Sequence, residues 1–392
     1  MRRPIAFAAY LLALGLLLSG LSACAAPGEG LGYYWQSVRG QLAVLQSARP
    51  IDDWLADTNT EPWLRKKLEL AKQARRFASA DLGLPDNGSY TKYVDLKRPS
   101  VVWNVFATPE LSIQLKQWCY PVVGCATYRG FYAKEDAERY AEYLRNQGLE
   151  AFVSGIPAYS TLGWFEDPLL SSFIRYPDAE VARTIFHELG HQVLYIQGDT
   201  TFNESFASAI EEIGLAKWLR LQPERDLLTK SYADFAMRKK DFIALLKKHR
   251  LALERVYNEV QSDDEKRRGK AEVFASLQRD YVSLKESWGG FKGYDGWFSQ
   301  KLSNAHLATV ATYSELVPGF VALHQKMGQP LPLQPFFEAV RVLSKRPKAE
   351  RDFLLGAPIL GGAGSSSALA SENASGTSSG TSTGAARTGL SK

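Results

Sequence analysis

The chain has 392 residues, of which 47 are Lys or Arg and 42 are Asp or Glu, and its formal net charge at pH 7 is +5. These charges are nearly balanced and interspersed, which argues against a nucleic-acid-binding protein. With 45% hydrophobic residues, the chain is long enough to bury a large core.

Residues 1–23 have the features of a signal segment that is removed from the mature protein. Arg2 and Arg3 form a basic start, and an apolar run follows from Ile5 to Leu18. The sequence Leu21-Ser22-Ala23-Cys24 then resembles the lipobox of bacterial lipoproteins, which implies cleavage before the cysteine and lipidation of its thiol. Such an anchor holds a protein on a membrane surface without a spanning helix.

The apolar run leaves one alternative open, an uncleaved transmembrane anchor, although the run is short for a bilayer span. By resemblance to the sorting rule of such lipoproteins, the absence of Asp after Cys24 favours the outer membrane, facing the periplasm. Cleavage would remove two Arg and no acidic residue, so 45 basic and 42 acidic residues would remain, a net charge of +3.

Two regions near the start of the mature chain are predicted to be helical. The first covers residues 33–80 and is broken at Pro50, with a second helix from Glu61 to Ala80. The second region is the charged segment from Lys134 to Asn146. In the first region, one amphipathic helix face is predicted from the spacing of Tyr34, Trp35, Val38, Leu42 and Leu45, and the second region is closed by Gly148.

Two other regions are predicted to form strands. Between Ser89 and Thr127 the chain is rich in aromatic and β-branched residues, and Arg98-Pro99 reads as a turn between the first two runs. We therefore expect antiparallel strands there. A second strand region runs from Glu150 to Phe165 and ends shortly before the most informative helix of the chain.

The mature chain keeps two cysteines, Cys119 and Cys125, six residues apart. In an oxidising periplasm they could close a small loop through a disulfide. Free buried thiols are the alternative. A zinc ribbon is not credible because there is no second cysteine pair.

The most informative motif is His187-Glu188-Leu189-Gly190-His191, inside a predicted helix from Val181 to Gln197. Positions i and i+4 project from one face of a helix, so His187 and His191 can chelate one ion. Neutral imidazole suits Zn²⁺, and Glu188 can act as a general base on a metal-bound water. The alternative is a pair of solvated or core histidines at helical spacing.

A zinc site of this kind needs a third protein ligand and an open position for water. Glu204 lies thirteen residues after His191, near the start of a second predicted helix from Thr201 to about Leu219. We predict it as the third ligand, against the alternative of a first-turn carboxylate favoured by the helix dipole. Two interpretations stay open for Glu211 on the same face: a hydrogen-bond partner of a ligand's ring N–H, or a solvated carboxylate.

The predicted strand before the motif helix supplies candidate substrate-binding residues. An exposed strand beside a metal cleft can pair with the main chain of an extended peptide. A purely structural edge strand is the alternative. The candidate residues are Tyr159, Ser160, Thr161, Leu162 and Gly163.

Beyond Glu204 the chain is predicted to be mostly helical to about Ser287, with a break between Gln261 and Lys270 that suggests a helical hairpin. Further helices are expected at Leu302–Thr312 and from Pro318 to about Met327. Residues 361–392 are nearly all Gly, Ser, Ala and Thr and should form a disordered tail. Residues 24–360 would then form one large domain, or two packed lobes that meet at the metal cleft.

The motif and the following run Asn203-Glu204-Ser205-Phe206-Ala207 resemble the gluzincin metallopeptidases, whose third ligand is a Glu on the next helix. More narrowly, the chain resembles the "putative aminopeptidase" family of bacterial lipoproteins over roughly residues 20–350. Beyond the lipobox, the motif and the Glu204 run, the shared segments are Val123-Gly124-Cys125, Tyr128-Arg129-Gly130-Phe131, Tyr159 to Phe165 and Ala308 to Pro318.

This resemblance implies a zincin-like α+β fold that is mostly helical, with a small antiparallel sheet next to the active-site helix. It also implies one Zn²⁺ held by His187, His191 and Glu204, with Glu188 as the base in peptide hydrolysis. Tyr313 is the candidate donor to the oxyanion because gluzincins often use a Tyr there. A packed aromatic is the alternative for Tyr313, and His306 is a weaker substitute.

Two functions follow from these patterns. The first is a zinc peptidase tethered in the periplasm that removes N-terminal residues from peptides. The second is a lipoprotein interaction module in which a metal only joins two helices. Because no motif marks an acidic cluster for a free amine, the aminopeptidase prediction rests on the resemblance. Endopeptidase or cell-wall peptide hydrolase activity also stays open.

Overall fold

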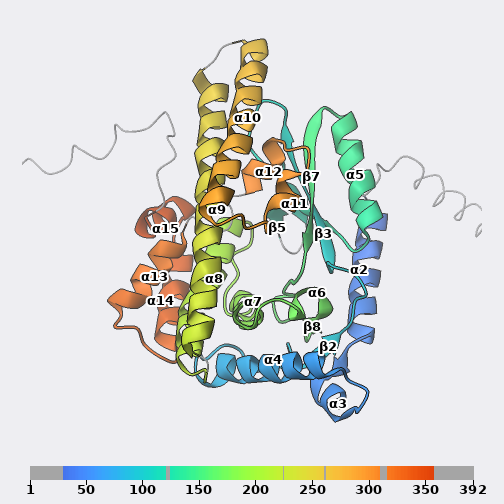
Figure 1. Ribbon diagram of the computed structural model, residues 1–392, viewed down its shortest axis with the longest axis vertical. Helices are drawn as coiled ribbons and strands as arrows, with labels where there is room; N and C mark the ends of the chain where they lie inside the picture. Colours follow the sequence, from blue (N-terminus) through green and yellow to red (C-terminus); the bar gives the residue numbers. More distant parts are fainter. Residues whose placement is uncertain (1–29, 121–123, 224, 260–261, 310–315, 357–392) are drawn as a thin grey trace, which may run out of the picture. The chain divides into compact units, whose positions relative to one another are not determined.

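Helices predominate in the chain, and small sheets are set among them, so the α+β prediction is confirmed (Figure 1). The computed structural model describes residues 30–120, 124–223, 225–259, 262–309 and 316–356. The first helices are α2 (Leu31–Gln46), α3 (Ile51–Ala56) and α4 (Pro62–Ala80). Pro50 separates α2 from α3, as predicted, and Pro62 occupies the first turn of α4, where its missing N–H costs no hydrogen bond.

The sheet with the longest strands has the order β6-β3-β7 and is antiparallel. Its strands are β3 (Val102–Pro109), β6 (Arg129–Phe131) and β7 (Leu149–Ile156). Successive side chains of a strand point to opposite faces. Trp103 and Val105 accordingly pack in a cluster with helix α5 (Lys134–Asn146), whereas Phe106 packs with Phe152 in a different cluster. Both faces of β3 are therefore covered.

A second sheet joins β1 (Arg49–Pro50), β2 (Lys92–Val94) and β8 (Leu169–Leu170); β1 pairs antiparallel and β8 parallel to β2. The runs on either side of Arg98-Pro99 thus belong to different sheets, and the predicted pairing of these two runs is wrong. Strand β3 has β6 and β7 on its two edges, so it has no free edge for β2.

Strands β4 (Trp118–Tyr120) and β5 (Gly124–Ala126) form a two-stranded antiparallel sheet. Cys119 and Cys125 lie directly opposite each other in this pair and are joined by a disulfide. The bond ties the two strands together.

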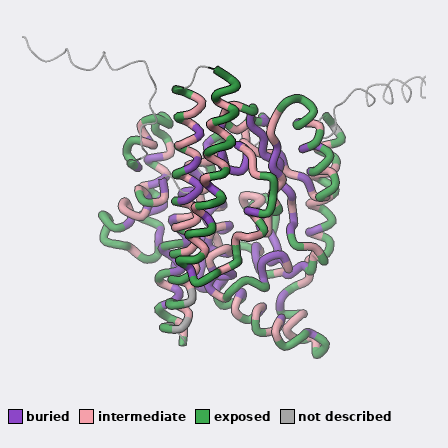
Figure 2. The backbone as a smooth tube through the Cα atoms, turned by 45° about the horizontal axis from the view of Figure 1, so that its top comes forward, coloured by how far each residue is buried: buried purple, intermediate pink, exposed green. Residues whose placement is uncertain are grey.

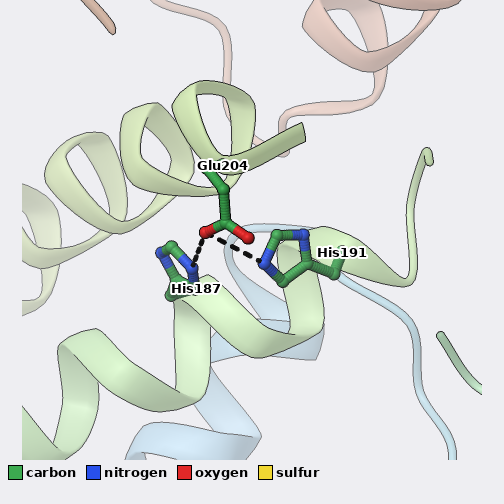
Figure 3. A group of neighbouring side chains, drawn as sticks. All are labelled: His187, His191 and Glu204. Atoms are coloured by element: carbon green, nitrogen blue, oxygen red, sulfur yellow. Dashed lines mark ion pairs between the residues drawn. The ribbon is translucent and has the colours of Figure 1, made fainter. Parts of the chain in front are cut away.

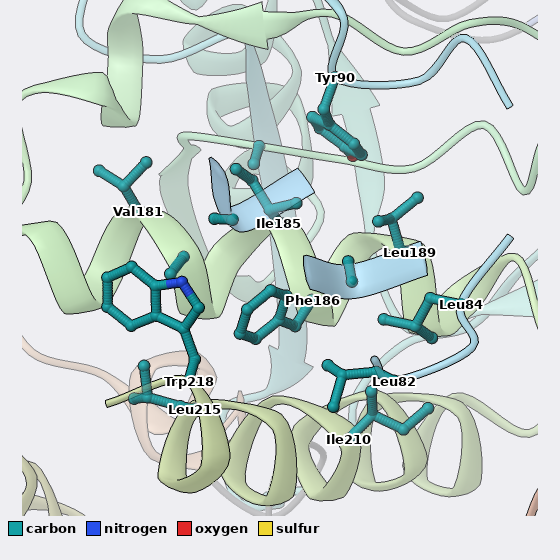
Figure 4. Close-up of a cluster of buried hydrophobic side chains, with 14 of the residues drawn as sticks. Leu82, Leu84, Tyr90, Val181, Ile185, Phe186, Leu189, Ile210, Leu215 and Trp218 are labelled. Carbon is teal, nitrogen blue, oxygen red and sulfur yellow. The ribbon is translucent and has the colours of Figure 1, made fainter. Parts of the chain in front are cut away.

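The largest core cluster surrounds helices α7 (Asp178–His191) and α8 (Thr200–Arg220). Ile185, Phe186 and Leu189 are fully buried and lie at helical spacing on one face of α7 (Figure 4). Helices α4, α13 (Val317–Lys326) and α14 (Gln334–Ser344) contribute to the same cluster. Burial of one face of α7 leaves its opposite face for polar side chains.

Helices α9 (Arg225–Glu259) and α10 (Asp263–Ser287) pack against each other as the predicted hairpin, although the helix resumes at Asp263, inside the predicted break. Leu253 and Leu277 are buried in the cluster that this pair shares with α11 (Asp295–Phe298) and α12 (Asn304–Ala308). Figure 2 shows exposed residues alternating with buried and intermediate ones along the long helices, as amphipathic packing requires.

Two other predictions differ from the structure, and two helices were missed. Residues 159–165 are not a strand but a turn-containing segment, because Leu162 and Gly163 both have positive φ angles, 58° and 82°, which no strand accommodates. Helix α7 ends at His191 rather than Gln197. Helices α14 and α15 (Lys348–Leu354) were not predicted, although Pro335 lies in the first turn of α14 and Pro347 directly precedes α15.

One short helix remains to be placed in the described part. Helix α6 (Ser171–Ile174) follows β8 directly and precedes α7. Among the described helices, none combines the length and the apolar character that a membrane span requires.

Candidate metal centre

The two helices that carry the predicted ligands pack closely against each other. A Cβ on Gly190 would lie 3.3 Å from Cα of Ala207 and 3.2 Å from Cδ1 of Ile210. Both contacts are tighter than most Cβ contacts, so the glycine inside the motif lets α7 approach α8. This close approach brings Glu204, in the second turn of α8, to the face of α7 that carries the histidines (Figure 3).

His187, His191 and Glu204 form a group that could hold a metal ion, with one ligand atom from each residue lying within 4.8 Å of the others. Nε2 of His187 is 3.4 Å and Nε2 of His191 is 3.8 Å from Oε2 of Glu204 (Figure 3). Two imidazoles and one carboxylate are a donor set that suits a tetrahedral Zn²⁺ with one position left open.

Glu211 lies behind His187, at the side away from the convergence point. Its Oε2 is 2.9 Å from Nδ1 of His187, and its Oε1 accepts a 2.5 Å hydrogen bond from Arg183. Arg183 also pairs with Glu180 at 2.8 Å. This chain of contacts fixes the ring of His187 with Nε2 toward Glu204, which is the arrangement that a metal-ligating histidine requires.

Four ionisable groups around the site have shifted pKa values. Burial opposes a charge on His187, but hydrogen bonds with Glu204 and Glu211 outweigh it and raise its pKa to about 10. Burial lowers the pKa of His191 to about 4, so this imidazole is neutral, the form that binds metal. Burial opposes the charge of Glu204 too, yet its bond to His187 lowers its pKa. Despite burial, Arg183 holds the pKa of Glu211 at about 2.

Glu188 is buried beside the ligands, and its burial raises its pKa to about 7. A carboxylate with a pKa near neutral is well matched to accept and return a proton. Burial, together with the charge of Glu188, raises the pKa of Tyr90, which Figure 4 places over α7 near Leu189.

Tyr90 itself has two unusual features. Its φ angle is 63°, a left-handed conformation that bulky residues rarely adopt. Its hydroxyl is buried and has no hydrogen-bond partner among the described residues. Backbone strain and unsatisfied polar groups concentrate at functional sites. Sequence reasoning missed Tyr90, because nothing local in the sequence signals either feature.

Polar contacts redirect the chain after His191 and explain why α7 ends there. The side chain of Asn203 donates to the carbonyl of Ile196 and accepts from its N–H, both at 2.8 Å. These bonds hold Ile196 in a non-helical segment. Gln192 meanwhile accepts from Asn87 at 2.8 Å and donates to Ser89 at 3.2 Å. The segment before β2 is thereby tied to the end of the motif helix.

The segment that carries the substrate-binding candidates lies beside the same helix end. A Cβ on Gly163 would be 3.7 Å from Oε1 of Gln192. Asp167 organises the segment by accepting two 2.8 Å bonds from Thr161, one from its N–H and one from its hydroxyl. Tyr159 points elsewhere, toward Gln41 and Tyr132. Leu162 donates its N–H to the hydroxyl of Ser160, which closes the turn.

Of the remaining candidates, His306 is not part of this group. His306 caps the N-terminus of α12, where its Nδ1 accepts from Ser303, and stacks on Phe152 with ring centroids 4.0 Å apart. That position serves packing and capping. Tyr313 and Cys24 lie outside the described residues.

The fold and the site together define a helical α+β protein with a three-residue group able to hold a metal ion. The chain belongs to the family described as "Putative aminopeptidase", whose model matches residues 32–355. That membership suggests peptide hydrolysis. No curated protein and no solved structure matches the chain.

Proposed function

We propose that the protein is a zinc-dependent peptidase that removes N-terminal residues from peptides, anchored by lipid on Cys24 at the periplasmic face of the outer membrane. The observation that carries the catalytic part is the convergence of His187, His191 and Glu204 beside the buried carboxylate of Glu188. A purely structural metal site would not need that carboxylate.

His187, His191 and Glu204 would hold the ion. When bound, Zn²⁺ supplies Lewis acidity, which polarises a substrate carbonyl and lowers the pKa of water. Glu188 takes a proton from the water that attacks the peptide carbonyl and then delivers it to the leaving amine. Glu211, which contacts Nδ1 of His187, would keep the ring oriented with Nε2 free to hold the ion.

The periplasmic location and the mature domain, residues 24–360, rest on the lipobox, and the exopeptidase assignment rests on family membership. Tyr313 is retained as a proposed donor to the oxyanion on the resemblance. The segment 159–163 is retained as a proposed substrate contact, now as a turn held by Asp167 beside Gln192.

The test combines metal analysis of the purified protein with two peptide substrates that differ only at the N-terminus. We expect one zinc per chain and hydrolysis of the peptide with a free α-amino group. The same peptide with an acetylated N-terminus should not be cleaved. Equal turnover of both peptides would replace the aminopeptidase with an endopeptidase, and no turnover by the zinc-loaded protein would favour a structural metal.

A further inference from the structure

Helix α2 is fixed to the fold through a largely polar face. Gln36 accepts the N–H of Tyr132 at 3.1 Å, and Gln41 accepts from the hydroxyl of Tyr132 at 2.8 Å. Tyr33 packs on Phe131 and under the guanidinium of Arg129, which lies 3.9 Å from its ring centroid. These contacts hold the helix against β6, so its outward face is determined by the fold.

The outward face of α2 is apolar. Its large side chains recur at helical spacing and are exposed to solvent by 44%, 68%, 51% and 47% in the order Tyr34, Trp35, Val38 and Leu42. Arg39 is the charged residue beside them. A surface helix normally turns its apolar face to the core and its polar face to water. The exposed face of α2 is instead apolar, although Val44 near the end of the helix is buried in the core, and an exposed apolar patch marks an interaction surface.

We infer that this face of α2, defined by Tyr34, Trp35, Val38 and Leu42, lies on the surface of the lipid bilayer to which Cys24 tethers the chain. The inference rests on the proposed lipidation but not on the proposed catalysis. Seven residues of chain lead from Cys24 to Leu31, which span about 25 Å when fully extended. A lipid on Cys24 therefore keeps the first turn of α2 within that distance of the membrane.

The side chains on the face suit a membrane interface better than a protein interface. Trp and Tyr concentrate at the level of lipid headgroups, where their rings are buried and their polar atoms stay hydrated. Val38 and Leu42 would reach the acyl boundary, as the apolar face of an interfacial helix does. Arg39 is positioned to meet lipid phosphate. The helix would thus give the tethered protein one orientation instead of free rotation about its anchor.

The direct test uses the lipidated protein in vesicles of phosphatidylethanolamine and phosphatidylglycerol whose acyl chains carry bromine, which quenches nearby Trp. The sequence contains nine Trp residues, so the comparison is with Trp35→Phe. The wild type should be quenched more than the variant. Equal quenching in both proteins would show that Trp35 does not touch the membrane and would overturn the inference.

A second measurement separates α2 from the anchor. The chain from residue 24 onward with Cys24→Ser carries no lipid, and its flotation with the same vesicles reports α2 alone. Replacing Trp35, Val38 and Leu42 together by Ser should reduce its bound fraction roughly tenfold or more. The matched control uses Val342 on α14 and Phe353 on α15, whose side chains are about as exposed as those of the face on α2. Replacing both by Ser should leave flotation unchanged.

The alternative occupant is a second copy of the chain. If the Cys24→Ser chain does not float but is dimeric by light scattering, and the triple Ser variant is monomeric, the face is a protein interface and the membrane assignment is wrong. If it is monomeric and does not float, the assignment is wrong as well. All variants should unfold at the wild-type temperature, because the replaced side chains are exposed.

Discussion

Helix α8 takes part in two polar clusters that are completed to different degrees. At its N-terminus, Asp199 accepts the N–H of Phe202 and pairs with Arg351 at 2.5 Å and with Lys348 at 3.2 Å. Both carboxylate oxygens are thus occupied, and charge is neutralised by charge. The cluster joins the start of α8 to α15, and the charge of the carboxylate is already balanced by cations of the chain.

Little more than one turn later, the cluster around Glu204 has the opposite character. Nε2 of two imidazoles and a carboxylate oxygen converge at 3.4–3.8 Å, although all three atoms bear lone pairs when the histidines are neutral. Nδ1 of His191 is buried without a partner in the described part of the chain. The comparison teaches that a satisfied cluster stabilises the fold, whereas convergent acceptors need a proton or a metal cation between them to become stable.

The largest expected effect is the loss of activity in Glu188→Gln, beside the cluster around Glu204. This change keeps the size of the side chain but removes the base, so kcat should fall by about 10²–10⁴ while zinc content and the unfolding temperature stay at wild-type values. Glu212→Gln, next to Glu211 on an exposed part of α8, is the control and should keep full activity. A Glu188→Gln enzyme as fast as the wild type would show that another group is the base.

The second largest effect is a loss of zinc affinity in Glu204→Ala. Replacing Glu204 by Ala removes one of three predicted ligands, so zinc affinity should fall by more than the roughly 10–100-fold that loss of a ligand's hydrogen-bond partner costs. Competition with a chelator of known affinity gives the measurement. Stoichiometric zinc at undiminished affinity in this variant would remove Glu204 from the ligand set.

Glu211→Gln should have an intermediate effect. The amide can still accept from Nδ1–H of His187, but it no longer balances the charge of Arg183 or strengthens His187 as a ligand. Zinc affinity should therefore fall about 10–100-fold, without loss of stoichiometry at saturating metal. An affinity equal to that of Glu212→Gln would mean that Glu211 serves only the ion pair with Arg183.

Much of this site could be anticipated because its information is local. The spacing of His187 and His191 follows from helical periodicity, and Glu204 follows from a second helix close in sequence. Arg183 could have been found as well, since it lies four residues before His187 on the same helix. Contacts between distant segments were not accessible: the ties of Gln192 to Asn87 and Ser89 join residues more than 100 positions apart.

Side-chain contacts that the sequence pattern does not reveal also explain the errors in the predicted fold. Residues 159–165 have strand-like composition, but Asp167 binds Thr161 twice and closes a turn. The helical pattern after His191 continues in sequence, yet Asn203 satisfies the backbone of Ile196 better than another helical turn would. In both places a polar side chain forms the hydrogen bonds that a strand or helix would otherwise form. The pattern of hydrophobic residues does not predict such bonds.

The completed cluster at Asp199 is expected to affect stability rather than catalysis. Asp199→Asn keeps a good N-cap but leaves the buried guanidinium of Arg351 without its counter-charge, so the free energy of unfolding should fall by about 3 kcal/mol. The control is Glu350→Gln, which removes a solvent-exposed pair with Arg346 and should cost less than about 1 kcal/mol. Urea unfolding at fixed zinc concentration measures both, and activity of the folded variant should be close to wild type.

The difference in free energy of unfolding between the wild type and Asp199→Asn should depend on pH if it arises from the charge of Asp199. Although burial opposes its charge, Arg351 and Lys348 lower the pKa of Asp199 below its ordinary value. A carboxylate with a lowered pKa in the folded state stabilises the fold above the pKa of the unfolded chain, about 3.9, and loses this contribution as pH falls through the folded value. The gap between wild type and Asp199→Asn should therefore be constant from pH 7 to about 5 and narrow below pH 4. A gap that does not change with pH would mean that Asp199 acts through its N-cap hydrogen bond and packing, not through its charge.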